Sequence, residues 1–591
     1  MHTPANSSRW TAVAQAARKF RARTLWLAAA APLLAAPETV NQIPIDLPEY
    51  KVQADRELPP PESWSYARIE GFEVLSNASE GDTQRLLADF QRFTHALSLV
   101  WPGMQPDNAS PAALIVCGQG QKFEEFLPDS LRGAPRAATA FSRRERERAT
   151  LVLDQQTKIL NLVTADGATT AAGADSETES TESTPDLGFT IDANQQLYRE
   201  YIRFLLSERQ PPHPVWFAEG LSQLFMNLRI TETEISIGRV ENPNLGTDRA
   251  DAKVREDRDF NVALANRALL PLDAMFALQA DSALAQNPID NVWAKQCYAF
   301  VHWGLYGDYG RHQREFLTFV NRAGREPLTE ALFKECFKLG YDEMLQALRG
   351  HIEFTRSKVA GVQADKGQKI PAPPPVVVRE ATEAEIGRLK GEAFALAGHP
   401  AAALEVLILS YRRGERDSAL LASLGLAELA GGDTARARKL LEKAVAGQVV
   451  RPRAYLELAR LRLAEGLAQP KGGQGKLSSE QTAGVLEPLF AARTQPPALA
   501  EIYELMAEAW TASAFPPTAA HLAAVEQGVK LFPRNTALVY RAADLRAQNG
   551  FPAEAHGLVR LGLKVARDEP TRAKFEQLQA RLPALAPAQP K

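Results

Sequence analysis

Four charged residues in the middle of the sequence have the spacing of a site built on two helices. Arg199, Glu200 and Arg203 lie in a stretch with helical spacing, and Glu219 follows a short loop. Residues at positions i and i+4 share one face of a helix, so the two arginines should point the same way. A guanidinium stays protonated at physiological pH and matches a carboxylate with paired donors. The spacing predicts that Arg199 or Arg203 pairs with Glu219 and ties the helices together; the alternative is that both arginines point to solvent.

The same spacing is that of the zinc-binding helix of a metallopeptidase. Such a helix carries H-E-x-x-H, so that two imidazoles converge on one ion while the glutamate acts as general base on zinc-bound water. This chain has Arg199 and Arg203 at the histidine positions, and Glu200 at the general-base position. An arginine has no free lone pair and repels a divalent cation. We therefore expect no zinc, no other cofactor and no catalysis at this position.

The surrounding sequence resembles the peptidase-MA-like, glutamate-zincin family of bacterial exported proteins. In that family the third zinc ligand comes from a following helix, and "PVWFAEGLSQLF" resembles that helix with Glu219 at the ligand position. The stretch "QCYAFVHWGLYGDYGRHQREFLTFVNRAG" resembles the family's downstream helix. The likeness covers about residues 190–356, and 64–165 by layout only. It implies an α+β zincin-like domain in which Arg199, Arg203 and Glu219 occupy vestigial metal-ligand positions.

The resemblance also implies a peptide-binding groove. Peptidases of this type hold an extended substrate against a strand edge, and a chain without the metal can keep this mode of binding. Trp216, Tyr298 and His302 are the residues that we associate with the groove. A shifted metal site made by His213, Glu219 and His302 is conceivable, but no two of the histidines outside the first residues are spaced i, i+3 or i+4.

Short patterns predict the local structure before the site. Residues 69–74 suggest one strand, 86–97 an amphipathic helix, and "AALIVCG" a buried strand. "QKFEEFL" suggests a short helix, and "ITETEISIG" a strand. In "RRERERATLVLD" the alternating charges are interpreted as a solvated strand face rather than a polar groove.

The C-terminal third repeats itself. Gly391 and Gly425 are separated by 34 residues, and so are Leu407 and Leu441. Thirty-four residues is the tetratricopeptide period, in which two antiparallel helices form one unit. The pattern predicts an all-α superhelix of tetratricopeptide type, where generic alanine-rich helical hairpins are the alternative.

Composition shifts divide the chain into expected segments. The Ser/Thr/Glu-rich stretch lacks large apolar residues and is expected to be disordered, and the Pro-rich stretch is expected to be a linker. The expected segments are 1–36 as a signal peptide, 37–62 as a linker, 63–356 as the degenerate zincin-like domain with 165–188 as a disordered insertion, 357–378 as the Pro-rich linker, 379–582 as tetratricopeptide repeats and 583–591 as a disordered tail.

The first residues suggest export. Four basic residues precede the apolar run "TLWLAAAAPLLAA", which is too short to span a bilayer and suits a signal peptide ending at Ala36. We expect a periplasmic or extracellular protein without a membrane-spanning segment in the mature chain. A net charge of −3 gives no reason to expect nucleic acid as a partner. The three cysteines match no metal or redox spacing and are expected to be buried thiols.

Three functions remain in competition. The first is a non-catalytic pseudo-metallopeptidase whose repeats bind a protein or peptide partner. The second is an active metallopeptidase with unusual ligands, which would hold zinc. The third is a plain tetratricopeptide adaptor whose first half is only structural.

Overall fold

The computed structural model describes most of the chain in two compact units. The residues described are 46–50, 58–101, 111–118, 123–132, 140–145, 147–155, 158–161, 188–191, 193–207, 213–226, 228–237, 254–255, 260–264, 267–278, 292–354, 359–366, 368–566 and 568–583. The second unit comprises Ile43–Glu62, Glu145–Arg148 and Thr382–Lys591, and the first unit comprises the rest. The insertion expected at 165–188 lies, apart from Gly188, outside the described residues, as do the expected signal peptide and most of the tail.

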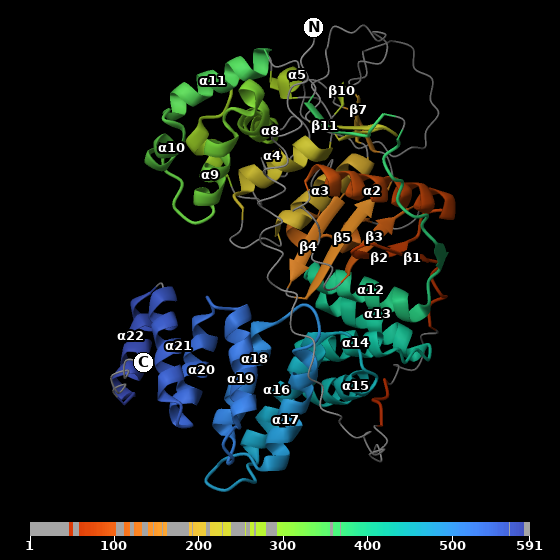
Figure 1. Cartoon of the computed structure of the whole chain (residues 1–591). Coiled ribbons are helices and arrows are strands. Elements are labelled where there is room, and N and C mark those ends of the chain that lie inside the picture. Colours follow the sequence, from red (N-terminus) through yellow and green to blue (C-terminus); the bar gives the residue numbers. More distant parts are fainter. Residues whose placement is uncertain are drawn as a thin grey trace. The chain divides into compact units, whose positions relative to one another are not determined.

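The first unit is built on a six-stranded mixed sheet (Figure 1). Its strand order is β12-β1-β2-β3-β5-β4. The pairs β1–β2 and β1–β12 are antiparallel, whereas β2–β3 and β3–β5 are parallel. The strands are β1 Ser65–Ile69, β2 Phe72–Ser76, β3 Ala112–Cys117, β4 Ala140–Glu145, β5 Arg148–Asp154 and β12 Val378–Glu380.

Two long helices cover one face of this sheet. They are α2, Glu80–Val100, and α3, Ala193–Ser207 (Figure 1). Ser79 caps α2 by accepting a hydrogen bond from the backbone N–H of Asp82. The Phe72 ring of β2 packs between the two helices, with ring centroids 5.7 Å from Phe90 and 5.9 Å from Tyr201. These aromatic contacts hold α3, and with it the two arginines, at a fixed place on the sheet.

A second layer of helices completes the first unit. Smaller strands accompany it in two three-stranded sheets, β10-β7-β6 and β11-β9-β8. The helices are α4 Val215–Met226, α5 Phe260–Leu264, α6 Leu272–Ala277, α8 Val292–Tyr306, α9 Gln313–Ala323, α10 Glu330–Phe337 and α11 Tyr341–Phe354. The strands are β6 Lys158–Asn161, β7 Gly188–Ile191, β8 Arg229–Ile230, β9 Glu234–Ile237, β10 Val254–Arg255 and β11 Val359–Gln363.

Several local predictions need correction. The single strand expected at 69–74 is a hairpin of β1 and β2, with the turn at Glu70–Gly71, where Gly71 has φ 78°. "QKFEEFL" forms a 3₁₀ turn, Phe123–Phe126. The Pro-rich connector contains β11, and β12 begins at its last residue and continues into the segment expected to be repeats. β12 pairs with β1. Because prolines break the alternation that marks a strand, this last pairing had no signal in the sequence.

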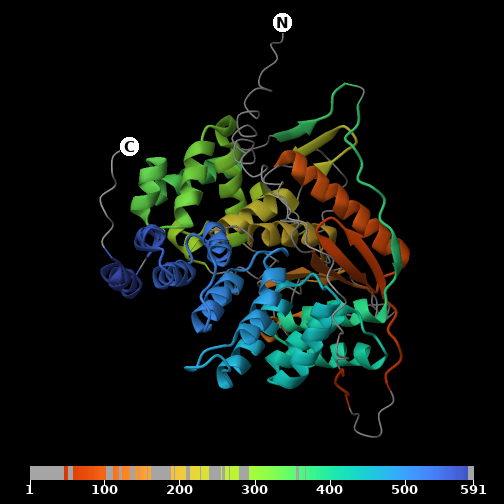
Figure 2. The same cartoon turned by 60° about the horizontal axis from the view of Figure 1, so that its bottom comes forward.

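The second unit is an array of antiparallel helix pairs (Figure 2). Gly391 and Gly425 explain the period, because an added Cβ would lie 2.7 Å from Leu407 in the first pair and 3.0 Å from Leu441 in the next. The helices are α12 Glu383–Leu396, α13 Pro400–Arg412, α14 Ser418–Ala430, α15 Thr434–Ala446, α16 Pro452–Ala468, α17 Ser479–Ala492, α18 Ala500–Ala512, α19 Ala519–Leu531, α20 Thr536–Gln548, α21 Pro552–Val565 and α22 Glu569–Arg581. The same glycine–leucine contact thus recurs at the predicted spacing.

None of the helices in the described part of the chain combines the length and apolarity needed to cross a membrane.

Candidate functional site

The two predicted helices face each other through their charged residues. Arg199 Nη2 donates to Glu219 Oε1 at 2.7 Å, and Arg203 Nη2 lies 3.6 Å from Glu219 Oε2. Arg203 also donates to Glu200 at 2.7 Å. Glu219 is fully buried and Arg199 is 6% exposed. The predicted pairing of arginine with Glu219 is therefore confirmed for both arginines, and the alternative that they point to solvent is wrong.

Glu219 owes its position to the start of α4 and to a close helix crossing. The carbonyl of Pro214 accepts hydrogen bonds from the N–H groups of Phe217 and Ala218, which begins the helix. Gly220 then lets α4 approach α8, because a Cβ there would clash with the Cys297 carbonyl and lie 2.6 Å from Val301. The carboxylate of Glu219 is thereby sealed between α3, α4 and α8.

Further polar side chains extend the pair into a network. Gln223 donates to Glu219 Oε1 at 3.1 Å and accepts from Lys295 Nζ at 2.9 Å. Ser142 of β4 donates to Glu200 at 3.1 Å. Lys295 comes from α8, so the network joins three helices and one strand. Sequence reasoning missed all three residues. Lys295 and Ser142 lie too far along the chain from their partners for a spacing argument. The i, i+4 spacing of Glu219 and Gln223 was a signal that could have found Gln223.

The electrostatics keep these groups in their charged forms. Burial alone would raise the pKa of Glu219, but the guanidiniums of Arg199 and Arg203 outweigh it and hold that pKa below its usual range. Burial works against the charge of Arg203 as well, and Glu200 and Glu219 together raise its pKa. Burial, with Glu219 adding to it, raises the pKa of the Cys297 thiol well above its ordinary value. The site therefore holds ion pairs, and Cys297 stays a thiol at neutral pH.

The residues associated with a groove lie in the core instead. Trp216 is 1% exposed, and its ring lies within 5.7 Å of the rings of Phe276, Phe300 and Phe319. Tyr298 is fully buried. The assignment of these residues to an open groove was wrong, because aromatic side chains in "WFAEGL" and "CYAFVHWG" fill the space between helices.

His302 likewise packs inside the first unit. Its Nδ1 lies 3.0 Å from His351 Nε2, and both rings pack against Phe260. His213 lies against Phe217, with ring centroids 5.3 Å apart. No cluster of three or more His, Cys, Asp or Glu residues suited to a metal ion occurs among the residues that the structure describes. The shifted site gains no support from this arrangement.

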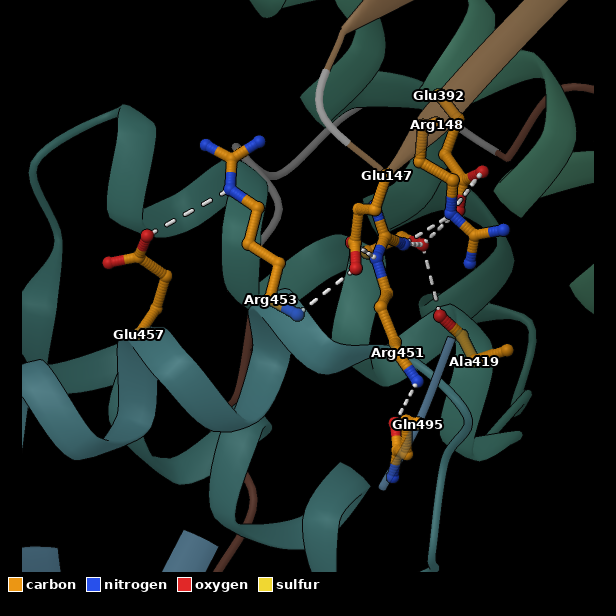
Figure 3. Close-up of polar contacts among 9 residues, drawn as sticks. Glu147, Arg148, Glu392, Ala419, Arg451, Arg453, Glu457 and Gln495 are labelled. Atoms are coloured by element: carbon orange, nitrogen blue, oxygen red, sulfur yellow. Dashed lines mark hydrogen bonds and ion pairs between the residues drawn. The ribbon is translucent and has the colours of Figure 1, made fainter. Parts of the chain in front are cut away.

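A second ion network lies in the second unit (Figure 3). Arg451 donates to Glu147 at 2.9 Å and to Glu392 at 2.7 Å, and Arg148 Nε lies 3.4 Å from Glu392. Burial would raise the pKa of Glu392, but Arg148, Arg451 and Arg388 lower it to about 2. The interpretation of "RRERERATLVLD" as a solvated face was thus wrong for Glu147 and Arg148. Arg451 thus bridges the two buried carboxylates of the network.

The repeats also contain a pocket of about 400 Å³ between α17, α18 and α19. His521 stacks on Trp510, with ring centroids 4.4 Å apart, and Phe515 is 54% exposed beside them. No local pattern in the sequence marks this pocket, because its lining comes from three separate helices.

Comparisons with known proteins found likeness to solved structures only. No family model matches this sequence, and no curated protein matches it. Among solved structures, MamA from Desulfovibrio magneticus RS-1 is 18% identical, with a TM-score of 0.25, and the alignment covers 32% of this chain and 99% of that one. TTC0263, a thermophilic TPR protein in Thermus thermophilus, is 18% identical over 34% of this chain and 100% of that chain, with a TM-score of 0.23. PilF of Pseudomonas aeruginosa is 13% identical, covering 34% and 91%, with a TM-score of 0.26. At these TM-scores the likenesses carry no conclusion about function.

Proposed function

We propose that this chain is a non-catalytic pseudo-metallopeptidase whose helical repeats make it a protein- or peptide-binding scaffold of the cell envelope. The observation that carries the first part is the pair of arginines one helical turn apart, at 2.7 Å and 3.6 Å from the same buried carboxylate. Two guanidiniums supply the positive charge that a zinc ion would place between α3 and α4. The network thus does the structural work of a metal while it offers no site for metal-bound water.

The strand next to this site supports a retained peptide-binding mode. β4 is an edge strand of the described sheet, and its Ser142 reaches Glu200. An edge strand offers unpaired backbone groups to an extended peptide. A peptide added to β4 would run past the former catalytic position, as a substrate does in the family that the sequence resembles.

The second unit supports the scaffold role by its architecture. Stacked helix pairs create extended surfaces that suit a protein partner, and their stability comes from neighbour contacts rather than from a ligand. Export to the periplasm or beyond is supported by the basic and apolar residues up to Ala36. Sequencing of the mature N-terminus tests this part: a start at or near Pro37 is expected, and an intact Met1 would contradict export by cleavage.

Restoring the two histidines tests the pseudo-site directly. The double variant Arg199→His, Arg203→His should bind one zinc ion per chain, because two imidazoles and Glu219 would then complete a three-residue ligand set. Zinc binding is measured by competition with a fluorescent chelator. Adding Glu219→Gln to the double variant is the matched control and should weaken zinc binding strongly.

A folded double variant that gains no zinc would contradict the inherited-site part of the proposal. Zinc bound in stoichiometric amount by the unmodified chain, together with chelator-sensitive proteolysis, would favour the alternative of an active metallopeptidase with atypical ligands.

A further inference from the structure

The repeats of this chain already hold an extended segment. Residues 46–50 and 58–62 have no helix or strand of their own, yet they group with the second unit. Figure 1 shows the red part of the chain running beside α12–α15. Leu47 and Tyr50 pack against the hydrophobic core of the repeats. The segment is therefore bound by the repeats and is more than a passive linker.

Tyr50 is the main anchor of the segment. Its hydroxyl donates to Glu428 Oε1 at 2.5 Å, and its ring meets Tyr411 edge-on with centroids 5.4 Å apart. Arg436 lies over the ring at 5.1 Å. Burial and the Glu428 carboxylate both raise the pKa of the Tyr50 hydroxyl, which keeps it a donor. Aromatic, cationic and carboxylate groups thus surround one tyrosine side chain.

The backbone near Tyr50 is also recognised. Tyr411 donates its hydroxyl to the carbonyl of Pro48 at 3.0 Å. Arg416 lies 3.7 Å above the Tyr411 ring and helps to fix its orientation. These contacts recognise the Tyr50 side chain and a backbone carbonyl two residues before it. Pro48 itself favours the extended conformation at low entropic cost.

A second contact holds the end of the segment. Glu62 pairs with Lys390 Nζ at 2.6 Å, and the Lys390 side chain is 6% exposed. Arg413 donates to the carbonyl of Pro59 at 2.7 Å. The two contact regions are made by side chains and isolated carbonyls, without ladder hydrogen bonds. Such a segment can leave without dismantling a helix or sheet.

We propose that α13–α15 form a binding site for an extended peptide that contains tyrosine, and that Leu47–Tyr50 of the same chain occupies this site as a tethered competitor until a partner peptide displaces it. The proposal rests on the scaffold function above and adds the chemistry of the partner and the way in which access is controlled. A segment that belongs to the same chain as its site acts at an effective concentration on the order of 1 mM. If the segment itself binds the open site with a dissociation constant of about 10 µM, a partner peptide would bind the closed protein roughly 100-fold more weakly than the open one.

The experiment uses the full chain and a fluorescein-labelled synthetic peptide with the sequence of residues 46–62. Binding is followed by fluorescence anisotropy. Tyr50→Ala weakens the tethered competitor and leaves the site intact, so the peptide should bind this variant at least 10-fold more tightly than the unmodified chain. Leu58→Ala, at a residue that is 39% exposed, is the matched control and should behave as the unmodified chain does.

Two further reagents test the chemistry of the site. A peptide with alanine at the position of Tyr50 should not bind the Tyr50→Ala protein. Adding Glu428→Ala to that protein should weaken binding of the original peptide about 10-fold, because a hydrogen bond to a charged group is lost. Circular dichroism and the Tm check each variant for folding. Should Tyr50→Ala fail to fold, Tyr50→Phe is the substitute, because it keeps the ring and loses the hydroxyl donor. The labelled peptide should bind Tyr50→Phe about 10-fold more tightly than it binds the unmodified chain.

Equal affinity of the peptide for the unmodified chain and for the Tyr50 variants would overturn the proposal, and so would absence of binding to folded Tyr50 variants. The zinc experiment concerns α3 and α4 of the first unit, so its outcome is independent. If the double histidine variant binds zinc and the Tyr50 variants bind no peptide, the peptide-site proposal is wrong and the pseudo-metallopeptidase proposal is unaffected.

Discussion

At the scale of single residues, the centre of the first unit is one carboxylate held by two cations. Glu219 is fully buried, and both arginines lie close to it. A buried carboxylate that loses its partner keeps its desolvation cost without the compensating attraction. Removing one partner should therefore lower the free energy of unfolding strongly, even where the intact pair adds little net stability.

Removal of Arg199 tests this reasoning. Arg199→Ala should lower the free energy of unfolding of the first unit by about 3–5 kcal/mol, because Glu219 is then left with one cation at a longer distance. Urea unfolding followed by tryptophan fluorescence measures it. Arg322→Ala is the control, since Arg322 pairs with Glu326 and Glu335 on the surface, where solvent screens the pairs, and its removal should lower the free energy of unfolding far less. Equal losses for the two variants would contradict the buried pair.

The partly buried His351 gives the first unit a dependence on pH. Burial lowers the pKa of His351 to about 4, with Asp308 raising it and His312 lowering it by smaller amounts. The unfolded chain takes up this proton near pH 6.5, so stability is fully present above that pH and falls as the pH drops towards 4. Between pH 7 and pH 5 the loss should be about 2 kcal/mol.

The substitution His351→Gln should flatten this dependence. Urea midpoints at pH 7 and pH 5, read by tryptophan fluorescence, compare the variant with the unmodified chain. An unchanged difference between the two pH values would show that another group is responsible.

At the scale of elements, the crossing of α4 and α8 places Glu219. Gly220→Ala should destabilise the first unit by about 1–3 kcal/mol, because the new Cβ meets the backbone carbonyl of Cys297, which cannot move aside as a side chain can. Gly350→Ala in α11 is the matched control, as nothing lies within 4 Å of its added Cβ. It should stabilise by up to about 1 kcal/mol through helix propensity. Urea unfolding distinguishes the two, and a stable Gly220→Ala protein would contradict the close crossing.

Some elements could be predicted because their signal is local. The repeat period is visible in the spacing of glycines and leucines that contact each other within one helix pair, such as Gly391 and Leu407. The pairing of Arg199 with Glu219 was also predictable, since the two helices are neighbours in the sequence and the residue types suit each other. The hairpin of β1 and β2 was missed because its turn, Glu70–Gly71, lies inside one apolar pattern.

Other features depend on contacts that no local pattern records. Glu147 and Arg451 are 304 positions apart, and each alone is an ordinary charged residue. Trp216 belongs to the stretch that resembles the peptidase family, but its side chain packs in the core. Its aromatic partners come from neighbouring helices, and sequence spacing does not reveal them. The charged pair of the site was thus predictable, whereas the contributions of Lys295 and Ser142 and the lack of an open groove were not.

At the scale of the whole molecule, acidification should lower the stability of the two units over different pH ranges. The first unit loses the contribution of His351 between about pH 6.5 and 4. The second unit keeps the contribution of Glu392 above about pH 4.5 and loses it as the pH falls towards 2, because the pKa of Glu392 is about 2 in the folded chain. Acidification should therefore weaken the first unit before the second.

Two optical signals separate the units. Tryptophan fluorescence reports mainly the first unit, which contains Trp64, Trp101, Trp216, Trp293 and Trp303, whereas circular dichroism reports the helices of both units. From pH 7 to pH 5 the urea midpoint by fluorescence should fall by more than the midpoint by circular dichroism. Coincident shifts of both midpoints would contradict independent units.

The strand that closes the sheet beside β1 is also the last part of the first unit to leave the ribosome. Ser65 of β1 pairs with Glu380 of β12. With about 300 residues between them and 5–20 residues added per second, β1 spends roughly 15 to 60 s of synthesis with one side open. During that interval the nascent chain, more than the finished protein, is exposed to wrong pairing with other strands, and a cell that makes this protein must shield it for that time.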